Sequence, residues 1–393
     1  MKKVVTLRNR LSLSRFTLVD VIFLVIIFSL LSVTITIFVF KKYIKINNTN
    51  DIDKVYNQII NDYYEEVDKE ELSKSAIDGM MKFLGEKYSI YMDTDSTNRL
   101  NEELDGKYHG VGIVAQKKDD GLYIIDVLKG TPADLGGLQK DDQILQLNDY
   151  VVKDNIEDAV KYIKEHDEIA FLIKRNESEV IINIKTSDID NPVTSSKIIS
   201  KDDKKYGYIY LESFSSSAYK QFKNELVSLE KDNINGLIID LRDNRGGYLD
   251  QLIEISSMFV KKDKTLFYLK DKNNSYEHFD KTDEYRDYPI VILTNGLTAS
   301  CSEMLALILK ENNGALIVGT TTFGKGRVQE TSSVGDSSMV KFTVAKWYSP
   351  NNNNIDEIGI RPNYIVELNK KYYSEPLEKN DNQLKKAIEV LSK

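Results

Sequence analysis

The stretch YPIVILTNGLTASCSEMLALILKENNGALIVG, residues 288–319, contains the pattern that decides the fold of this chain. It begins with an apolar run over 288–295, continues with an apolar helix pattern over 302–310 and ends with a second apolar run over 315–319. Near-continuous apolar strands that alternate with helices are typical of a sheet buried on both faces. The stretch therefore predicts an α/β layer architecture.

The same alternation extends in both directions from this stretch. Strand patterns occur at 206–211 and 236–242, and a helix pattern follows at 250–259. Toward the C-terminus, a strand is expected at 340–348 and a last helix at 382–391. These segments are predicted to belong to the same α/β layers.

The residues before this region have different patterns. From about 101 to 188, short strand patterns surround the helix pattern of 155–165, which predicts a compact β-rich module. The polar stretch SDIDNPVTSSK, 187–197, contains Pro192 and is expected to be a linker. Within 46–100, apolar residues at helical spacing predict two amphipathic helices.

Residues 21–40, VIFLVIIFSLLSVTITIFVF, are twenty consecutive positions without a charge. At about 1.5 Å per residue, a helix of this length just crosses a hydrocarbon core of about 30 Å. The run is too long for the apolar core of a signal peptide, so one uncleaved transmembrane helix is predicted. Five basic residues precede the run and three follow it, which places the N-terminus, residues 1–20, in the cytoplasm. The chain after about residue 45 is then expected to lie outside the cytoplasm.

Composition narrows the classes of partner and cofactor. The 393 residues carry a net charge of −8, and because residues up to 45 sum to +7, the remainder carries −15. An electrostatic field of that sign disfavours binding of nucleic acid. Cys301 is the only cysteine and the three histidines are scattered, so neither an intramolecular disulfide nor a metal site is expected. No cofactor is implied.

The segment GLTASCSEM, 296–304, connects the first apolar run of the central stretch to its helix. A hydroxyl at such a turn is exposed, and the N–H groups at the start of the helix can stabilise an oxyanion. Ser300 is thus a candidate nucleophile. Ser300 and Glu303 also have the spacing of a capping box, so an ordinary helix N-cap is the alternative interpretation.

The segment ALIVGTTTFGKGRVQE, 315–330, contains the spacing G-x-x-x-x-G-K of a phosphate-binding P-loop. Gly326 stands where such a loop needs Ser or Thr to bind Mg²⁺, and the next residues favour a strand over a helix, so a nucleotide site is disfavoured. Lys325, between two glycines, can instead approach another backbone in a desolvated site, where an ammonium group loses its proton readily and can act as a base. A solvated loop lysine is the alternative.

The segment LRDNRGGYLD, 241–250, follows another apolar strand pattern. Its adjacent glycines, Gly246 and Gly247, present backbone N–H groups without side-chain obstruction, which suits an oxyanion pocket at the edge of a sheet. A turn that requires positive φ angles is the alternative. None of the three segments decides the chemistry alone.

Together the three segments resemble the C-terminal processing peptidases, also called tail-specific proteases, which are serine enzymes with a Ser/Lys catalytic pair and an embedded PDZ domain. The family pattern S-A-S-A-S-E is similar to TASCSE at 298–303, which implies that Ser300 is the nucleophile. The family pattern F-G-K-G-x-V-Q is present in full at 323–329. The resemblance implies that Lys325 is the general base and that Gln329 orients its amine.

The resemblance extends to the glycine segment. The family pattern D-L-R-x-N-P-G-G is similar to residues 240–247, with Arg245 where proline is usual. It implies an oxyanion hole formed by a glycine N–H, that of Gly246 in preference to Gly247, and by the N–H of Cys301. Cys301 replaces the usual alanine, and because no histidine lies within 20 residues of it, a thiol nucleophile is not expected.

Within the β-rich module, the run Gly110, Val111, Gly112 and Ile113 is similar to the carboxylate-binding loop of PDZ domains. Such a loop binds a terminal carboxylate through backbone N–H groups while the peptide adds to the sheet as a strand. An ordinary hairpin is the alternative for an isolated G-x-G. The resemblance implies that unfolded or extended protein C-terminal tails are the partners.

The resemblance covers about residues 51–392 and implies an α/β protease core of the layered ClpP/crotonase type with an inserted PDZ domain and an N-terminal helical segment, beside the one transmembrane helix. The expected parts are a cytoplasmic N-terminus at 1–20, a transmembrane anchor at 21–40, a helical region at 46–100, a PDZ domain at 101–188, a serine protease core at 189–370 and a C-terminal helical segment at 371–393.

The implied activity is that of a membrane-anchored, extracytoplasmic serine endopeptidase. It is expected to cleave proteins near or after recognition of an apolar C-terminal tail, through an acyl-enzyme. A catalytically inert scaffold that binds C-terminal peptides through its PDZ domain is the alternative. The family often forms homodimers, so a homodimer is expected, with membrane contact through the single helix and no contact with nucleic acid.

Overall fold

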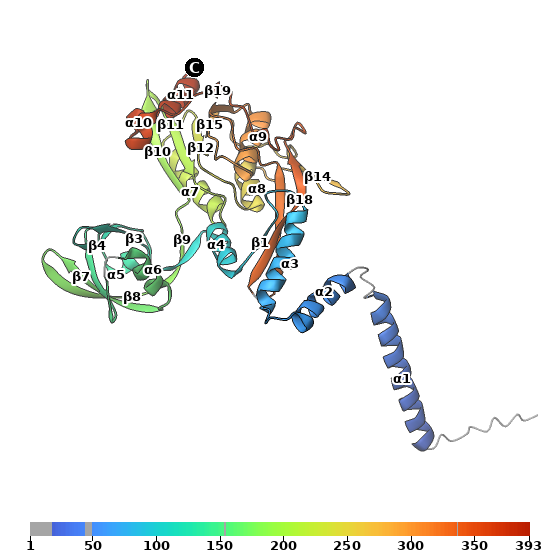
Figure 1. The fold of residues 1–393 in the computed structure, drawn as a ribbon. Helices are drawn as coiled ribbons and strands as arrows, with labels where there is room; N and C mark the ends of the chain where they lie inside the picture. The colour runs from blue at the N-terminus through green and yellow to red at the C-terminus, as the bar shows by residue number, and fades with distance from the viewer. Residues whose placement is uncertain (1–17, 44–48, 153–154, 336) are drawn as a thin grey trace, which may run out of the picture. The chain divides into compact units, whose positions relative to one another are not determined.

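A computed structural model of the chain describes residues 18–43, 49–152, 155–335 and 337–393 (Figure 1). The chain divides into two units, residues 1–79 and 80–393. The described elements of the first unit are α1 (Leu18–Tyr43), α2 (Thr49–Asp62) and most of α3 (Lys69–Phe83). The two amphipathic helices predicted within 46–100 are confirmed as α2 and α3.

The predicted membrane span, residues 21–40, lies inside helix α1. Its described side chains, among them Phe23 and Phe28, are exposed. Within the ranges that the structure describes, no helix has both the length and the apolarity required to cross a membrane. Of the predicted cytoplasmic N-terminus, residues 1–17 lie outside the described part of the chain.

The α/β core is built on a six-stranded sheet with the strand order β10-β11-β12-β15-β16-β19. Neighbours from β11 to β19 pair in parallel, whereas β10 pairs antiparallel to β11 at the edge. Parallel neighbours require crossover connections, which accounts for the alternation of strands and helices in the sequence. The strands are β10 (Thr194–Lys201), β11 (Lys204–Leu211), β12 (Leu237–Asp240), β15 (Ile290–Thr294), β16 (Leu316–Gly319) and β19 (Tyr364–Ile365).

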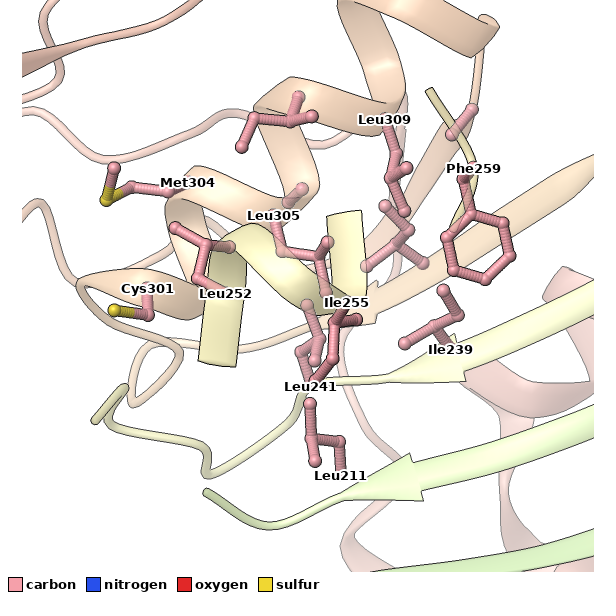
Figure 2. Close-up of a cluster of buried hydrophobic side chains, with 14 of the residues drawn as sticks. Leu211, Ile239, Leu241, Leu252, Ile255, Phe259, Cys301, Met304, Leu305 and Leu309 are labelled. Atoms are coloured by element: carbon pink, nitrogen blue, oxygen red, sulfur yellow. The ribbon is translucent and has the colours of Figure 1, made fainter. Parts of the chain in front are cut away.

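Helices pack against both faces of this sheet because successive strand residues point to opposite faces. Ile239 and Ile292 belong to a buried cluster with residues of α7, α8 and α9, and Figure 2 shows side chains of α8 and α9 over β12. Ile238 and Val291 belong to a second cluster with α11. The predicted α/β layers are therefore confirmed. These helices are α7 (Ala218–Glu230), α8 (Leu249–Ser257), α9 (Cys301–Asn313) and α11 (Asn382–Leu391), the last preceded by the short α10 (Lys370–Ser374) and η1 (Glu378–Asn380).

A second, antiparallel sheet has the order β1-β18-β13-β14, with β17 also paired to β18. The strand expected at 340–348 is confirmed as part of β18, but it lies in this sheet and not among the parallel strands. Its residues are mostly half-buried, as expected for a sheet that is covered less completely than the central one. The strands are β1 (Ile90–Met92), β13 (Thr265–Lys270), β14 (Ser275–Phe279), β17 (Arg327–Val334) and β18 (Ser338–Tyr348), and α4 (Thr94–Asp105) follows β1.

The β-rich module is confirmed as a sheet of order β3-β4-β5-β7-β8, with β6 paired to β5, and its core includes residues of α5 and α6. A two-stranded ribbon, β2 with β9, connects the module to the rest of the unit. The stretch predicted as a linker, 187–197, provides this connection, and buried Ile189 and Val193 draw it into β9 and the start of β10. The elements are β2 (Lys107–Gly110), β3 (Ile113–Lys118), β4 (Gly121–Val127), α5 (Pro132–Gly136), β5 (Gln143–Leu147), β6 (Tyr150–Val151), α6 (Ile156–Lys164), β7 (Glu168–Arg175), β8 (Ser178–Lys185) and β9 (Ser187–Asp190).

Candidate active site

Three loops follow the parallel strands β12, β15 and β16 at the carboxyl edge of the central sheet. The register of these strands aligns their last residues, so the loops 241–247, 295–300 and 320–326 begin side by side. Ligand sites of parallel α/β sheets form at this edge. The three segments that the sequence singled out are thus brought together by the sheet.

Hydrogen bonds join the three loops to one another. The Thr298 hydroxyl donates to the Leu241 carbonyl (2.8 Å), and the Ala299 N–H donates to the Asn244 carbonyl (3.0 Å). The Phe323 N–H donates to the carbonyl of Thr298 (3.0 Å). The loop before Ser300 therefore lies between the glycine loop and the lysine loop and is bonded to both.

Ser300 occupies the N-cap position of α9 with φ 57° and ψ −121°. An ordinary N-cap residue has extended backbone angles, and a positive φ at a non-glycine residue costs about 1–3 kcal/mol. Such a strained strand-to-helix turn is the geometry that exposes a nucleophilic hydroxyl at the start of a helix. Ser300 is therefore at an N-cap, as the alternative interpretation held, but its backbone is that of a nucleophile turn.

The carboxylate of Glu303 connects the nucleophile to the lysine loop. Its Oε2 accepts hydrogen bonds from the N–H groups of Ser300 and Lys325, both at 2.9 Å. Its Oε1 accepts from the Thr322 hydroxyl (2.5 Å) and the Gly324 N–H (2.8 Å). Glu303 is fully buried, which raises the pKa of its carboxyl, while these four hydrogen bonds oppose the rise. One side chain thus fixes the backbones of both predicted catalytic residues.

Two glycines allow the backbone around Lys325 to pack closely against another segment. A Cβ on Gly324 would lie 2.8 Å from the backbone nitrogen of Gly359, and a Cβ on Gly326 would lie 2.8 Å from that of Asp356. Strand β17 and not a helix follows, which excludes the P-loop geometry. The expected close backbone approach is confirmed, and Lys325 is half-buried.

The Lys325 ammonium lies in surroundings that favour its neutral form. Burial lowers the pKa of Lys325, and the positive charge of Lys341 lowers it further. The Nζ atom lies over the ring of Tyr88, 5.5 Å from its centroid. Among the described residues, Nζ has no hydrogen-bond or ion-pair partner. The neighbours that oppose the lowering are Cys301, Glu303 and Glu86.

Gln329 lies on β17 beyond the lysine loop, at a bulge where the pairing with β18 shifts register. Its Nε2 donates to the hydroxyl of Thr343 (3.4 Å). Bulges re-aim side chains and occur often beside active sites. In this structure the Gln329 amide is therefore bonded to β18 and not to the Lys325 amine, and its orienting role stays a prediction.

One of the N–H groups predicted to form the oxyanion hole is already hydrogen-bonded within the chain. Gly246 lies beside the nucleophile, since a Cβ there would be 2.9 Å from the Cβ of Ser300. The Gly246 N–H, however, donates to Oδ1 of buried Asn244 (2.8 Å). Over the described residues, the N–H groups of Gly247 and Cys301 have no hydrogen-bond acceptor. The choice between the two glycines stays a prediction, and in this structure the N–H of Gly247 is the one without a partner.

The thiol of Cys301 is buried and donates to the Gly247 carbonyl (3.3 Å). Burial raises the pKa of Cys301 to about 11. A thiol that stays protonated at neutral pH is a poor nucleophile. The side chain therefore fills space beneath the site, in the cluster that Figure 2 shows.

The glycine loop is anchored from behind by Arg242, which is buried. Its guanidinium donates to Asp240 at the end of β12 (2.9 Å from Nε to Oδ1) and to Asp381 at the start of α11 (2.8 Å). A third bond reaches Gln383 (3.0 Å). The C-terminal helix thus holds the strand end from which the glycine loop departs, and the sequence had no signal for this link.

The predicted peptide-binding run, Gly110 to Ile113, connects β2 to β3. The carbonyls of Val111 and Gly112 accept from Ala133 (2.8 Å) and Leu128 (2.9 Å). Within the described residues, the N–H groups of Val111 and Gly112 have no acceptor, and β3 is an edge strand of its sheet. Free N–H groups beside an open strand edge have the arrangement needed to bind a terminal carboxylate and an added strand.

Four residues that contact the site have roles that the sequence did not predict. Glu303 was considered only as part of a capping box, and Asn244 only as part of a motif. Tyr88, beside Lys325, and Glu86, which bonds Arg327 of β17, lie in a region predicted to be helical. Only Glu303 had a usable signal, because a Glu three residues after a serine nucleophile can bond the backbone N–H of that serine.

Models of three protein families match the chain. The model described as peptidase family S41 matches residues 205–366, the PDZ domain model matches 99–180, and the model of the activating protease CtpB N-terminal domain matches 39–96. These ranges correspond to the α/β core, the β-rich module and the N-terminal helices.

The groups of His, Cys, Asp and Glu in the described part of the chain include none arranged to hold a metal ion.

Curated relatives match over most of the chain. A probable CtpA-like serine protease of Staphylococcus aureus (strain COL) is 32% identical over 92% of this chain and 75% of its own length. The carboxy-terminal processing protease CtpB of Bacillus subtilis (strain 168) is 33% identical over 86% of this chain and 71% of its own length. A putative S41 protease from Bacteroides fragilis has a similar fold, with a TM-score of 0.50, 18% identity, and coverage of 84% of this chain and 91% of its own.

Identity at this level over most of both chains requires a common fold and a common family. The sheet edge that carries Ser300 and Lys325 lies within the matched S41 region. The chain therefore belongs to peptidase family S41, and it is a C-terminal processing serine protease with a PDZ domain and a CtpB-like N-terminal domain.

Proposed function

We propose that the chain is a membrane-anchored, extracytoplasmic endopeptidase that cleaves proteins after its PDZ domain has bound an apolar C-terminal tail. The observation that carries the catalytic part is the Glu303 carboxylate, which bonds the backbones of both Ser300 and Lys325 at 2.9 Å. A strained serine and a lysine with a lowered pKa on adjacent loops are the parts that Ser/Lys acyl transfer requires.

In the acylation step, neutral Lys325 accepts the proton of the Ser300 hydroxyl as Oγ bonds to the peptide carbonyl carbon. The carbonyl oxygen takes up the electron pair and is stabilised by the N–H groups of Cys301 and of a glycine in the 246–247 pair. The lysine then gives its proton to the departing amine, the C–N bond breaks, and an acyl-enzyme remains.

In the deacylation step, the same lysine accepts a proton from water as the water oxygen attacks the ester carbonyl. The second tetrahedral intermediate collapses, the C–O bond to Ser300 breaks, and the lysine returns the proton to Oγ. Gln329 is proposed to orient the amine through its amide carbonyl oxygen, while its Nε2 stays bonded to the Thr343 hydroxyl. No step requires a metal or an organic cofactor.

Tail recognition is assigned to the β-rich module. The N–H groups of Val111 and Gly112, which have no acceptor in the described part of the chain, support binding of a terminal carboxylate. The open edge of β3 supports addition of the tail as a strand. Apolar side chains of the tail would then face α6, which packs beside β3. This specificity is proposed for unfolded or extended tails because a folded C-terminus cannot pair with a strand edge.

The anchoring and topology are proposed from residues 21–40, a twenty-residue run without a charge, and from the basic residues before it. The full chain expressed in bacterial cells is expected to stay in the membrane fraction after alkaline carbonate washing. A variant that lacks 21–40 is expected to be released. A protease added outside spheroplasts is expected to digest residues 46–393. Release of the full chain by carbonate, or complete protection in spheroplasts, would contradict the proposal.

The catalytic proposal is tested with the full chain in detergent and a loosely folded test protein that has an apolar C-terminus. The parent is expected to cleave this protein, and Ser300→Ala is expected to lose at least about 10⁴-fold in rate because the acyl-enzyme cannot form. Product masses are measured by mass spectrometry. Equal cleavage by both chains would show that Ser300 is not the nucleophile.

The same assay separates recognition from chemistry. A test protein with an amidated C-terminus lacks the carboxylate, and its cleavage is expected to slow mainly through KM, because the Val111 and Gly112 N–H groups lose their acceptor. The matched control is a short ester substrate that cannot reach the module. Its free-acid and amidated forms are expected to react at equal rates. An unchanged KM for the amidated protein would assign recognition to another surface.

A further inference from the structure

The residues between α3 and β1 contact strand β17, which begins two residues after Lys325. Glu86, whose side chain is 13% exposed, accepts a hydrogen bond from Nη1 of Arg327 (3.1 Å). Its other oxygen accepts from the hydroxyls of Thr343 (2.9 Å) and of Ser89. The Ser89 hydroxyl in turn accepts from the Thr343 N–H (3.1 Å). One carboxylate from an early part of the unit therefore bonds β17 and β18 together.

The bonds of Glu86 to Arg327 and Thr343 lie next to the proposed catalytic lysine and to Gln329. Arg327 lies two residues after Lys325 and two before Gln329, and Thr343 faces Gln329 across the bulge and accepts from its Nε2 (3.4 Å). The chain of bonds runs from Gln329 through the Thr343 hydroxyl to the Glu86 carboxylate. It fixes the direction in which the Gln329 amide points.

Tyr88 lies beside the Lys325 amine. The Lys325 Nζ lies 5.5 Å from the centroid of its ring, and Lys87 and Arg327 lie over the same ring at 5.1 and 5.7 Å. The Tyr88 hydroxyl is buried and has no hydrogen-bond partner among the described residues. The Tyr88 ring thus packs beside the amine, which must be neutral to act as a base.

We propose that Glu86 is a positioning residue of the protease reaction, which sets the Lys325 and Gln329 side chains by holding Arg327 and Thr343. It acts from residues that precede the PDZ domain and lie outside the region 205–366 matched by the protease family. The inference rests on the proposed roles of Lys325 and Gln329. It makes the N-terminal region part of the catalytic machinery, beyond any role in localisation.

Because Glu86 is one of the charges around Lys325, its replacement is expected to shift the pH dependence of the rate, which loss of a merely structural contact would not do. Burial raises the pKa of the Glu86 carboxyl, but hydrogen bonds from Ser89, Thr343 and Arg327 more than offset it, so the pKa lies below its ordinary value. Its negative charge raises the pKa of Lys325, whereas the positive charge of Lys341 lowers it. The ionisable groups around the amine are Glu86, Lys87 and Tyr88 before β1, Cys301 and Glu303 on α9, Arg327 on β17 and Lys341 on β18.

The experiment measures kcat and KM of the full chain in detergent between pH 5.5 and 9.5, with thermal melts to compare folding. Glu86→Gln is expected to lower kcat at least about tenfold with KM changed less than about twofold, because small misplacements of a base are costly. The midpoint of the acid limb is expected to move to lower pH, because the charge that stabilised the ammonium is gone. Lys341→Gln is expected to move it to higher pH.

Three further variants keep the result interpretable. Glu86→Asp restores the charge and is expected to return the acid limb toward its original position. Thr343→Val keeps the Glu86 charge and the Arg327 bond but removes the link to Gln329, so it is expected to lower kcat without moving the acid limb. Glu330→Gln removes an exposed carboxylate next to Gln329 and is the matched control, with unchanged kcat expected.

The outcomes separate this inference from the proposed function. Full activity in Lys325→Ala would show that the assigned base is wrong, and the inference would fail with it. An inactive Lys325→Ala together with a folded Glu86→Gln of unchanged kcat and unchanged acid limb would overturn the inference alone. A lower kcat in Glu86→Gln with the acid limb moved to lower pH supports it.

Discussion

Replacement of Lys325 by Ala is expected to lower kcat by about 10⁴-fold near pH 8, with a much smaller change in KM. The reason is that one amine accepts the Ser300 proton, protonates the leaving group and activates water, so its loss affects every proton transfer. The measurement is steady-state cleavage of the test protein by the full chain. Lys264→Ala is the matched control, because it removes an exposed lysine on the surface of the α/β region, and its kcat is expected to be unchanged.

The assignment of Lys325 as the base also predicts how the rate of the parent changes with pH. Burial and Lys341 lower the pKa of Lys325, and only the neutral amine is a base, so kcat/KM is expected to rise with pH through that lowered pKa. A pH-independent rate between pH 6 and 9, with chemistry limiting, would contradict the assignment of the base.

The same lowered pKa affects stability with a defined sign. Between the folded and unfolded pKa values of Lys325, the unfolded chain binds more protons, so the free energy of unfolding rises with pH. Lys325→Met removes this linkage. Its stability gain over the parent, from denaturant unfolding, is expected to be largest below the folded pKa and to shrink as pH approaches about 10.4, the ordinary lysine value. A gain that is independent of pH would show that the amine is not desolvated.

Replacement of Glu303 by Gln is expected to lower kcat by about 10²-fold and to destabilise the fold by about 3 kcal/mol. The carboxylate accepts four hydrogen bonds in a fully buried position, from Ser300, Thr322, Gly324 and Lys325. The amide group of Gln is a donor on one side, so it faces two of these donors and cannot accept from them. The nucleophile and lysine loops then lose their common attachment.

Glu311→Gln is the matched control for this prediction. Glu311 lies on the same helix and anchors another loop, through the Ser349 hydroxyl (2.9 Å) and the Asn351 N–H (2.7 Å), away from the catalytic residues. It is expected to lose stability but to keep kcat when rates are compared at equal folded fraction. A Glu303→Gln variant that loses stability but keeps kcat in the same way would show that Glu303 only supports the fold.

Local patterns were sufficient for the core strands β11, β12, β15 and β16 and for the helices α2, α3, α8, α9 and α11, but they did not reveal β10, β19 or α7. Apolar runs and helical spacing are properties of neighbouring residues, so a strand such as β15 and a helix such as α9 can be read directly. The strand structure of the linker at 187–197 was not predicted, because its two buried positions, Ile189 and Val193, lie among polar residues and become buried only through pairing with other strands. The strand at 340–348 was found, but its sheet could not be assigned, because periodicity does not specify which strand is the neighbour.

The sequence by itself determined the α/β alternation, the apolar run at 21–40 and the identity of Ser300 and Lys325 as candidates, because each of these depends on residues close together in the chain. The tertiary structure alone decided their partners. In the folded chain, Glu303 lies between the two loops and the Gly246 N–H donates to Asn244. The Gln329 amide donates to Thr343, and Glu86 contacts Arg327, which is 241 positions away in the sequence. Buried polar groups must find partners wherever packing places them, and packing joins segments whose separation in the sequence carries no record of the contact.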